Sequence, residues 1–230
     1  MADTLARFQA LFAQDDLSCT VSDALGRSGA LGAAFRPVWP GARLMGPAVT
    51  VKVFGTDLSA VFDGIAAAGV GSVLVIDSHG VTGSAFWGER TTRAALARGL
   101  AGAVIDGGCR DVTAVRTLGF PVFSTAVTPN AGLPGGRGAV NVPVAVGGQP
   151  VLPGDLMVAD DNGVVCVPQA QIANTLEQVQ ALLEAERTLL ASTADPALLP
   201  AAQNLVSDPN PVVAEAAGWA AARLTGGGPP

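Results

Sequence analysis

The sequence of 230 residues contains no tyrosine, one histidine (His79), one lysine (Lys52) and three cysteines. A zinc site built from three histidines is therefore excluded, a Ser-His-Asp triad would have to use His79, and a Schiff-base enzyme would have to use Lys52. Cys19, Cys109 and Cys166 are scattered without Cys-x-x-Cys spacing, which argues against a disulfide framework and fits a reducing cytosol. If the protein is an enzyme, the available groups are Asp, Glu, Arg, backbone amides and a hard metal ion.

Long apolar runs and clusters of positive charge are also missing. No run of about 18 apolar residues is free of Gly, Pro or charge, so we expect no membrane span. Residues 1–15 carry acids and lack a continuous apolar segment, so we expect no signal peptide. The net charge of −6 disfavours nucleic acid and anionic membranes as partners. Hydrophobic residues at 49% against charged residues at 14% predict a folded chain with a large core.

Helix and strand patterns alternate through the first half of the chain. After a helix over 4–14 and a short helix that Thr20 or Ser22 can cap, β-branched or apolar runs alternate with amphipathic segments. The expected strands lie at 48–54, 72–77, 103–106 and 121–124, and the expected helices at 58–68, 89–98 and 111–118. This rhythm predicts a mostly parallel sheet with crossover helices.

The second half has a different character. Alternating valines over 140–146 predict a half-buried strand, which Pro143 makes an edge candidate, and two strands at 156–159 and 164–167 flank an Asp161-Asn-Gly163 hairpin turn. A long amphipathic helix is expected over 169–192, a mobile loop over 129–138, a further helix over 211–224 and disorder over 226–230. We expect one domain over 1–192 and an Ala/Pro/Gly-rich tail over 193–230, partly helical or disordered.

The densest group of chemically useful residues follows the strand expected at 103–106. A glycine turn there places Arg110 and Asp111 side by side at a helix start, and ligands in such sheets gather beyond the carboxyl ends of the strands. Arginine offers a planar fork for a carboxylate or enolate, and aspartate is a hard oxygen ligand for Mg²⁺. The alternative is that Asp111 caps the helix and Arg110 pairs with a surface acid.

A second group, Trp87-Gly-Glu-Arg-Thr91, opens the helix expected at 89–98. Free amides at a helix N-terminus bind anions, and Gly88 permits close approach of a ligand to the backbone. Because every helix has an N-terminus, this signal depends on its pairing with Arg110 and Asp111.

Other ionisable and nucleophilic residues have simpler interpretations. Asp77 and Asp106 are expected to end strands and cap turns, and Cys109 is expected to be a packing residue because no base is nearby. Glu186 falls on the apolar stripe of the long helix, where an acid lies at a rim, is paired, or reaches a site on a neighbouring chain.

Several motifs in the same order resemble the 4-hydroxy-4-methyl-2-oxoglutarate aldolase family, which also contains the regulator of ribonuclease E activity. The resemblance runs from about Thr20 to Arg187. Its motifs are Val21-Ser-Asp-Ala-Leu25, Pro40-Gly-Ala-Arg43, Gly46-Pro-Ala-Val-Thr50, Gly88-Glu89, Gly102-Ala-Val-Ile-Asp-Gly-Gly-Cys-Arg-Asp111, Phe120-Pro-Val-Phe123, Pro153-Gly-Asp-Leu156 and Asp160-Asp-Asn-Gly-Val164.

The resemblance implies an α/β chain with a three-layer β/β/α swivelling-domain fold and a C-terminal helical extension, assembled as a trimer or a dimer of trimers. It also implies an aldolase that splits 4-hydroxy-2-oxo diacids to release pyruvate, uses Mg²⁺ or Mn²⁺ and decarboxylates oxaloacetate. Backbone from Gly88 through Arg90 to Thr91 would hold the pyruvyl carboxylate, and Arg110 would contact the ketone oxygen. Asp111 would bind the metal, with Glu89 orienting its waters. These implied roles make Arg110, Glu89 and Asp111 the catalytic candidates.

In some members of the family a C-terminal glutamate of the adjacent subunit completes the site, and Glu186 is the candidate here. Two other functions remain open: a non-enzymatic protein that binds and inhibits a ribonuclease, and a related lyase or decarboxylase that acts on another oxo acid. A shared fold does not choose between them. The intact Gly88-Glu89 and Arg110-Asp111 pairs favour the enzyme.

Overall fold

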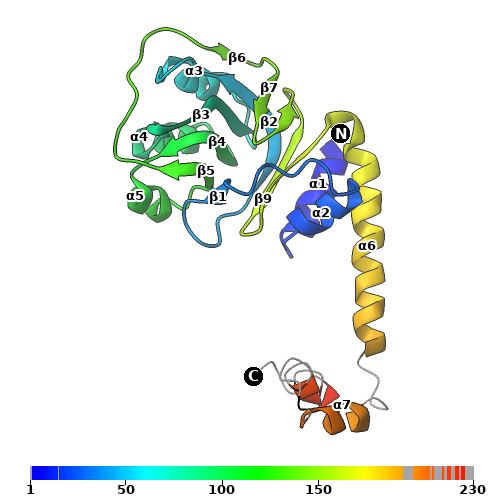
Figure 1. Ribbon diagram of the computed structural model, residues 1–230. Coiled ribbons are helices and arrows are strands. Elements are labelled where there is room, and N and C mark those ends of the chain that lie inside the picture. The colour runs from blue at the N-terminus through cyan, green and yellow to red at the C-terminus, as the bar shows by residue number, and fades with distance from the viewer. Residues whose placement is uncertain are drawn as a thin grey trace. The chain divides into compact units, whose positions relative to one another are not determined.

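The computed structural model describes residues 2–14, 16–193 and 199–207, with scattered positions between 209 and 225 (Figure 1). Residues 1–179 form one compact unit and residues 180–230 another, and each is described by itself. The division falls inside the long helix α6 (Ile172–Thr193), and α7 (Leu199–Leu205) lies in the second unit. The helix expected over 211–224 and the disorder expected over 226–230 fall largely or wholly outside the described residues.

The first unit alternates strands and helices along the chain. Its helices are α1 (Ala2–Phe12), α2 (Ser18–Ala24), α3 (Ser59–Ala67), α4 (Glu89–Ala97), α5 (Val112–Thr117) and the 3₁₀ turn Gln169–Gln171. Its strands are β1 (Arg36–Pro37), β2 (Leu44–Lys52), β3 (Val73–Trp87), β4 (Gly102–Cys109), β5 (Val122–Val127), β6 (Ala139–Val140), β7 (Val144–Val146), β8 (Gln149–Val151), β9 (Leu156–Asp160) and β10 (Gly163–Val167).

One eight-stranded mixed sheet organises this unit, in the order β1-β5-β4-β3-β2-β9-β10 with β6 also paired to β2. Strands β2, β3, β4 and β5 run parallel, as the alternation of the first half predicts. The β9–β10 hairpin joins the sheet antiparallel to β2, and its turn contains the expected Asn-Gly. Because the central strands are parallel, their carboxyl ends meet at one edge.

The sheet buries apolar side chains on both faces. On one face Leu74, Ile76 and Ile105 pack with Val61 of α3 and Ala95 of α4. The side chains that alternate with these along the strands point to the other face, where they meet the two-stranded β7–β8 hairpin. The result is a helical layer, a central sheet and a small second β layer, which confirms the expected α/β fold (Figure 1).

The strand expected to end at Asp77 is longer than the sequence indicates. Strand β3 continues to Trp87, pairing irregularly with β4, with register shifts after Asp77. Asp77 and Asp106 therefore lie opposite each other within paired strands, so the expectation that each ends its strand is wrong. Bulges allow a polar, glycine-containing segment to stay extended in spite of its turn-like composition.

Two further expectations are corrected. The valines of 140–146 do not form one strand, because Asn141 adopts a left-handed φ of 56° and splits the segment into β6 and β7. Helix α2 begins at Ser18, before the expected caps at Thr20 and Ser22. The Ser18 N–H and hydroxyl donate to the buried Asp160 carboxylate at 2.8 and 2.6 Å. A carboxylate distant in sequence thus takes the place of a local cap, which a local pattern cannot reveal.

Within the described residues no helix is long and apolar enough to cross a membrane. All three cysteines are free, with Cys109 and Cys166 buried and Cys19 exposed, as expected of a chain without a disulfide framework.

Candidate functional site

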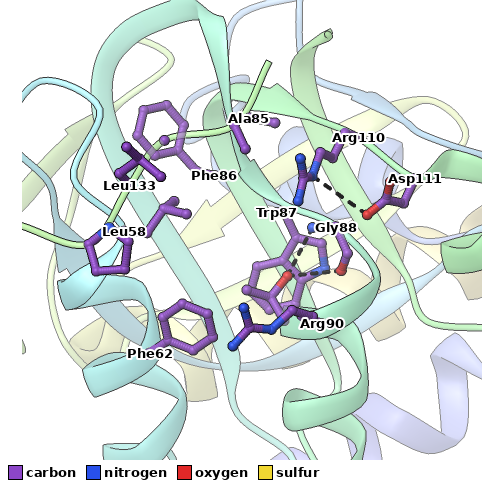
Figure 2. Close-up of a pocket in the computed structure, with 14 residues that line it drawn as sticks. Leu58, Phe62, Ala85, Phe86, Trp87, Gly88, Arg90, Arg110, Asp111 and Leu133 are labelled. Carbon is purple, nitrogen blue, oxygen red and sulfur yellow. Dashed lines mark hydrogen bonds and ion pairs between the residues drawn. The ribbon is translucent and has the colours of Figure 1, made fainter. Parts of the chain in front are cut away.

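A cavity of about 330 Å³ lies where β3 and β4 end (Figure 2). This volume falls within the range of small-molecule sites, which begins at about 300 Å³. Its walls come from β3, the start of α4, the turn after β4, helix α3 and the segment 131–134. The lining residues are Leu58, Phe62, Ala85, Phe86, Trp87, Gly88, Arg90, Thr91, Arg110, Asp111, Ala131, Gly132, Leu133 and Pro134. The structure therefore brings together five of the six site residues expected in this unit.

Arg110 and Asp111 form an ion pair at the mouth of this cavity, with Arg110 Nε 3.6 Å from Asp111 Oδ2. The Arg110 N–H donates to the Trp87 carbonyl at 2.9 Å, which fixes the turn after β4 against the end of β3. Asp111 has left-handed backbone angles, φ 55° and ψ 36°, which aspartate tolerates better than most residues. Its carboxylate makes no side-chain cap to α5 and instead accepts the Glu89 N–H of α4 at 3.0 Å.

The alternative interpretation of this pair therefore holds only in part. Asp111 occupies the position immediately before α5, but its carboxylate stabilises the start of α4. Arg110 pairs with Asp111 itself and with no other described acid. The pair is half-exposed and faces the cavity, where a ligand can reach it.

The start of α4 presents backbone donors to the same cavity. The Gly88 N–H donates to the Thr91 hydroxyl, and that hydroxyl donates back to the Gly88 carbonyl, both at 2.9 Å. With the Glu89 N–H bound to Asp111, the N–H groups of Arg90 and Thr91 are the first-turn donors left without an acceptor in the helix. Such donors favour an anion such as a carboxylate.

Glu89 points toward a second, more open hollow of about 580 Å³ that shares Arg110 and Asp111 with the first. Its Oε1 accepts a hydrogen bond from Arg93 Nε at 2.8 Å and forms an ion pair with Arg93 Nη2 at 2.7 Å. The Arg110–Asp111 pair thus borders both hollows, of which the first is the less open. Glu89 is the one expected site residue of this unit that does not line the first cavity.

The donor set fits a divalent ion only as a water-rich site. Within the described ranges no cluster of three or more His, Cys, Asp or Glu side chains could enclose a metal. Asp111 Oδ1 accepts no hydrogen bond from any described group, and Glu89 lines the same open hollow. Mg²⁺ typically keeps several waters and binds one or two carboxylates together with its substrate, so this pair of acids is sufficient.

The apolar wall of the cavity was not predicted as part of the site. Leu58, immediately before α3, and Phe62 of α3 line the cavity. Leu133 and Pro134 come from the segment expected to be a mobile loop. The signal that could have found this wall is Asp57, an acid immediately before an apolar helix face.

Asp57 is a buried carboxylate that ties this loop to α3. It is 4% exposed and accepts backbone N–H groups from Ser59 at 2.9 Å, Gly135 at 2.8 Å and Arg137 at 2.9 Å. The Leu58 N–H also donates to the Leu133 carbonyl at 3.3 Å. The loop is thus hydrogen-bonded to the helix that supplies the opposite part of the wall. The hydrogen bonds from Ser59 and Gly135 hold the pKa of Asp57 well below its usual range.

We expect Asp57→Asn to lower the melting temperature by several degrees at neutral pH, because an amide cannot accept all three N–H groups. Since the folded-state pKa is lowered, the carboxylate's contribution is present above the unfolded pKa of about 3.9 and is lost as pH falls through the lower folded pKa. The difference in melting temperature between the variant and the wild type should therefore narrow as pH falls below about 4. Thermal unfolding between pH 7 and 3 checks this, with Asp63→Asn on the exposed face of α3 as the control. A difference independent of pH would contradict it.

The remaining candidates lie outside the cavity lining. Lys52 is half-buried at the end of β2, and the His79 side chain is 54% exposed, with Nδ1 3.3 Å from Asp77 Oδ1. Burial and the neighbouring Asp77 raise the pKa of Asp106. Burial raises the pKa of Cys109 to about 12, which agrees with a packing residue. The side chain of Glu186 lies outside the described residues.

Residues 18–166 match the family described as RraA-like, Aldolase/RraA. A protein of Halalkalibacterium halodurans, provisionally named a 4-hydroxy-4-methyl-2-oxoglutarate aldolase, is 38% identical over 160 residues, covering 70% of this chain and 76% of its own.

Two solved structures extend the similarity. An uncharacterised protein from Pseudomonas syringae pv. tomato has a TM-score of 0.71 and 30% identity, covering 84% of this chain and 92% of its own. Streptomyces coelicolor RraAS2, described as an unusual member of the RNase ES inhibitor RraA family, has a TM-score of 0.69 and 28% identity. That match covers 84% of this chain and 96% of RraAS2.

Proposed function

The chain belongs to the RraA-like family of aldolases and RraA proteins, and on that premise we propose that it is a divalent-metal-dependent aldolase. In this proposal it cleaves 4-hydroxy-2-oxo diacids, such as 4-hydroxy-4-methyl-2-oxoglutarate, to release pyruvate, and it decarboxylates oxaloacetate as a side activity. The homologue's name supports the lyase class. The substrate, the metal and the side activity are part of the proposal.

The observation that carries the proposal is the position of Arg110 beside the first turn of α4. The Arg110 side chain and the α4 N-terminus line one cavity, so a guanidinium and two backbone N–H donors meet there. A 2-oxo acid carries a carboxylate and a carbonyl oxygen on adjacent carbons. In the proposed binding mode, the N–H groups of Arg90 and Thr91 bind the carboxylate and Arg110 donates to the carbonyl oxygen.

The reaction then follows from the charge that develops on that oxygen. The 4-hydroxyl loses its proton to water, and its oxygen becomes the carbonyl oxygen of the second product as the C3–C4 bond breaks. The electron pair of that bond forms the C2–C3 double bond of an enolate, which leaves the negative charge on the C2 oxygen. Arg110 stabilises this oxygen most strongly when it becomes negative, which accelerates cleavage. Protonation at C3 gives pyruvate. Loss of CO₂ from oxaloacetate produces the same enolate, so one site suffices for both reactions.

Asp111 would hold the divalent ion through Oδ1, and Glu89 would orient water in the open hollow that the two acids share. When bound, Mg²⁺ or Mn²⁺ supplies additional positive charge for the enolate oxygen. A lysine imine is not required, in agreement with the position of Lys52 outside the cavity lining.

A coupled assay of pyruvate release over a panel of 4-hydroxy-2-oxo acids and oxaloacetate, with and without Mg²⁺ or Mn²⁺, tests the proposal. We expect turnover that depends on the ion, and no pyruvate trapped on the protein by borohydride. Absence of turnover on every substrate would contradict the proposal. Inhibition of a ribonuclease by the same preparation would then favour the second candidate, which the description of the Streptomyces coelicolor relative supports.

We further propose that the protein acts as a homotrimer or a dimer of trimers, as the family resemblance implies, with Glu186 of an adjacent subunit completing the site. Light scattering at micromolar concentration measures the assembly. A monomer would contradict this part of the proposal.

Gly88→Ala is expected to lower pyruvate release by about 10²-fold, the typical cost of displacing reacting groups by about 1 Å. A Cβ at Gly88 would lie 2.6 Å from Asp111 Oδ2 and 3.1 Å from Arg110 Cγ, so both side chains must move. The backbone itself accepts alanine, because φ is −170°. Gly83→Ala is the matched control, since no atom lies within 4 Å of its added Cβ. Equal activity of the two variants would exclude tight packing around Gly88.

A further inference from the structure

Arg90 contributes its side chain, and not only its backbone, to the cavity. It projects from the first turn of α4, and its guanidinium carbon lies 5.8 Å from the centroid of the Phe62 ring of α3 (Figure 2). An arginine over an aromatic face is held by cation–π attraction, which restricts where its fork can point. Arg90 and Arg110 therefore place two guanidinium groups on the lining of one cavity.

The charge of Arg90, unlike that of the neighbouring arginines, is not paired with a described acid. Arg93 is paired with Glu89, and Arg110 with Asp111. Among the described residues no carboxylate lies within ion-pair distance of Arg90, which is solvent-exposed and lies over the Phe62 ring. The cavity lining thus holds two guanidinium groups against the single carboxylate of Asp111. This excess of positive charge favours a ligand with more than one negative group.

The cavity wall across from the two arginines is largely apolar (Figure 2). It contains Leu58, immediately before α3, Phe62 of α3 and Leu133 of the tethered loop. Apolar side chains on the wall suit the carbon chain of a ligand, and the guanidinium groups suit its anionic groups. A ligand that spans this cavity would therefore have an anionic group at each end and a short carbon chain against the wall.

We propose that the Arg90 side chain binds the second carboxylate of the substrate, at the end away from Arg110, and thereby sets a preference for diacids over monoacids. The inference rests on the proposed function, which assigns the oxo end to Arg110 and the α4 backbone. Arg90 then acts on the part of the substrate that does not react, so its contribution is to binding in the ground state and transition state alike. Phe62 is the positioning residue that holds its fork.

The test compares two substrates that differ in one group, 4-hydroxy-2-oxoglutarate and 4-hydroxy-2-oxopentanoate, in which a methyl replaces the second carboxylate. Arg90→Gln should lower kcat/KM for the diacid by about 10- to 100-fold, as expected for loss of a charge-assisted hydrogen-bonded pair. The change should lie in KM with kcat nearly constant, because the interaction is uniform along the reaction. The fall for the monoacid should be much smaller, because the substitution keeps the backbone N–H that binds the carboxylate of the oxo acid. Arg90→Lys should recover only part of the preference, since lysine lacks the planar fork.

Arg116→Gln removes a positive charge from the exposed face of α5 and serves as the control. Retained discrimination in Arg90→Gln would overturn the proposal. An equal fall for both substrates would also overturn it, because it would assign Arg90 a purely structural role in joining α4 to α3.

A binding experiment separates this inference from the proposed function. Calorimetric titration with 2-oxoglutarate and with 2-oxopentanoate requires no turnover. Tighter binding of the diacid to the wild type, lost in Arg90→Gln, supports the role of Arg90 even when no pyruvate is released. Equal affinity for the two acids, or binding of neither, overturns it.

Discussion

Replacement of Arg110 by lysine is expected to lower kcat for pyruvate release by about 10²-fold or more, the typical effect of removing a donor that stabilises a developing oxyanion. Arg110 lines the cavity and is fixed by its backbone bond to the Trp87 carbonyl and by the ion pair with Asp111. Lysine keeps the positive charge but lacks the planar fork, so it cannot donate to the enolate oxygen and pair with Asp111 in the same geometry. Because the interaction strengthens in the transition state, kcat should fall more than KM rises.

Steady-state kinetics on the best substrate of the panel provide the measurement, and Arg116→Lys on the exposed face of α5 is the matched control. Thermal unfolding of both variants shows whether the fold is kept. A large rise in KM at constant kcat would instead assign Arg110 to ground-state binding of the substrate.

Replacement of Asp111 should affect the metal requirement instead. The concentration of Mg²⁺ or Mn²⁺ needed for half-maximal activity should rise at least about tenfold. Oδ2 of this carboxylate is occupied by the Glu89 N–H, and Oδ1 is the oxygen left for an ion. Asp111→Ala should therefore be rescued in part by excess Mn²⁺. Titration of the metal into the variant by calorimetry gives a readout that does not depend on turnover.

Asp111→Asn separates the two roles of this side chain. Its amide oxygen can still accept the Glu89 N–H, and asparagine tolerates the left-handed φ of 55°, so the start of α4 should be preserved. The negative charge is lost, so metal affinity should still fall. If Asp111→Ala and Arg110→Lys both keep normal turnover without added metal, the pair is structural, and the protein is better understood as a binding module.

The sequence predicted that Arg110 and Asp111 lie between a strand and a helix because this arrangement is local in the chain. Arg110 and Asp111 are adjacent in the chain, follow a buried strand and precede a helix, and in parallel sheets that position is where ligands bind. The Gly88 turn opens the neighbouring crossover helix, so the topology alone brings it to the same edge. The Asp161-Asn-Gly163 hairpin was equally predictable, since turn chemistry depends on a few consecutive residues.

Errors arose where distant contacts override local composition. The polar segment after Asp77 resembles a loop, yet pairing with β4 through register shifts keeps it extended. The start of α2 depends on Asp160, which lies 142 residues from Ser18, and no local pattern contains that information. Composition also gave no sign that the loop over 129–138 is tied to the start of α3, where Asp57 accepts the N–H groups of Gly135 and Arg137.

The sequence by itself determined the chemical groups available, the α/β class and the adjacency of Arg110 and Asp111 at a helix start, because these follow from composition, periodicity and chain order. Only the tertiary structure determined that a cavity forms beside that pair and which other residues line it. Its apolar wall joins residues at α3 and in a loop some 70 positions later in the chain, and its second cation is Arg90, which lies over the Phe62 ring. Such a wall exists only when the elements pack, since burial and the spacing of charges across a cavity are properties of three-dimensional neighbours.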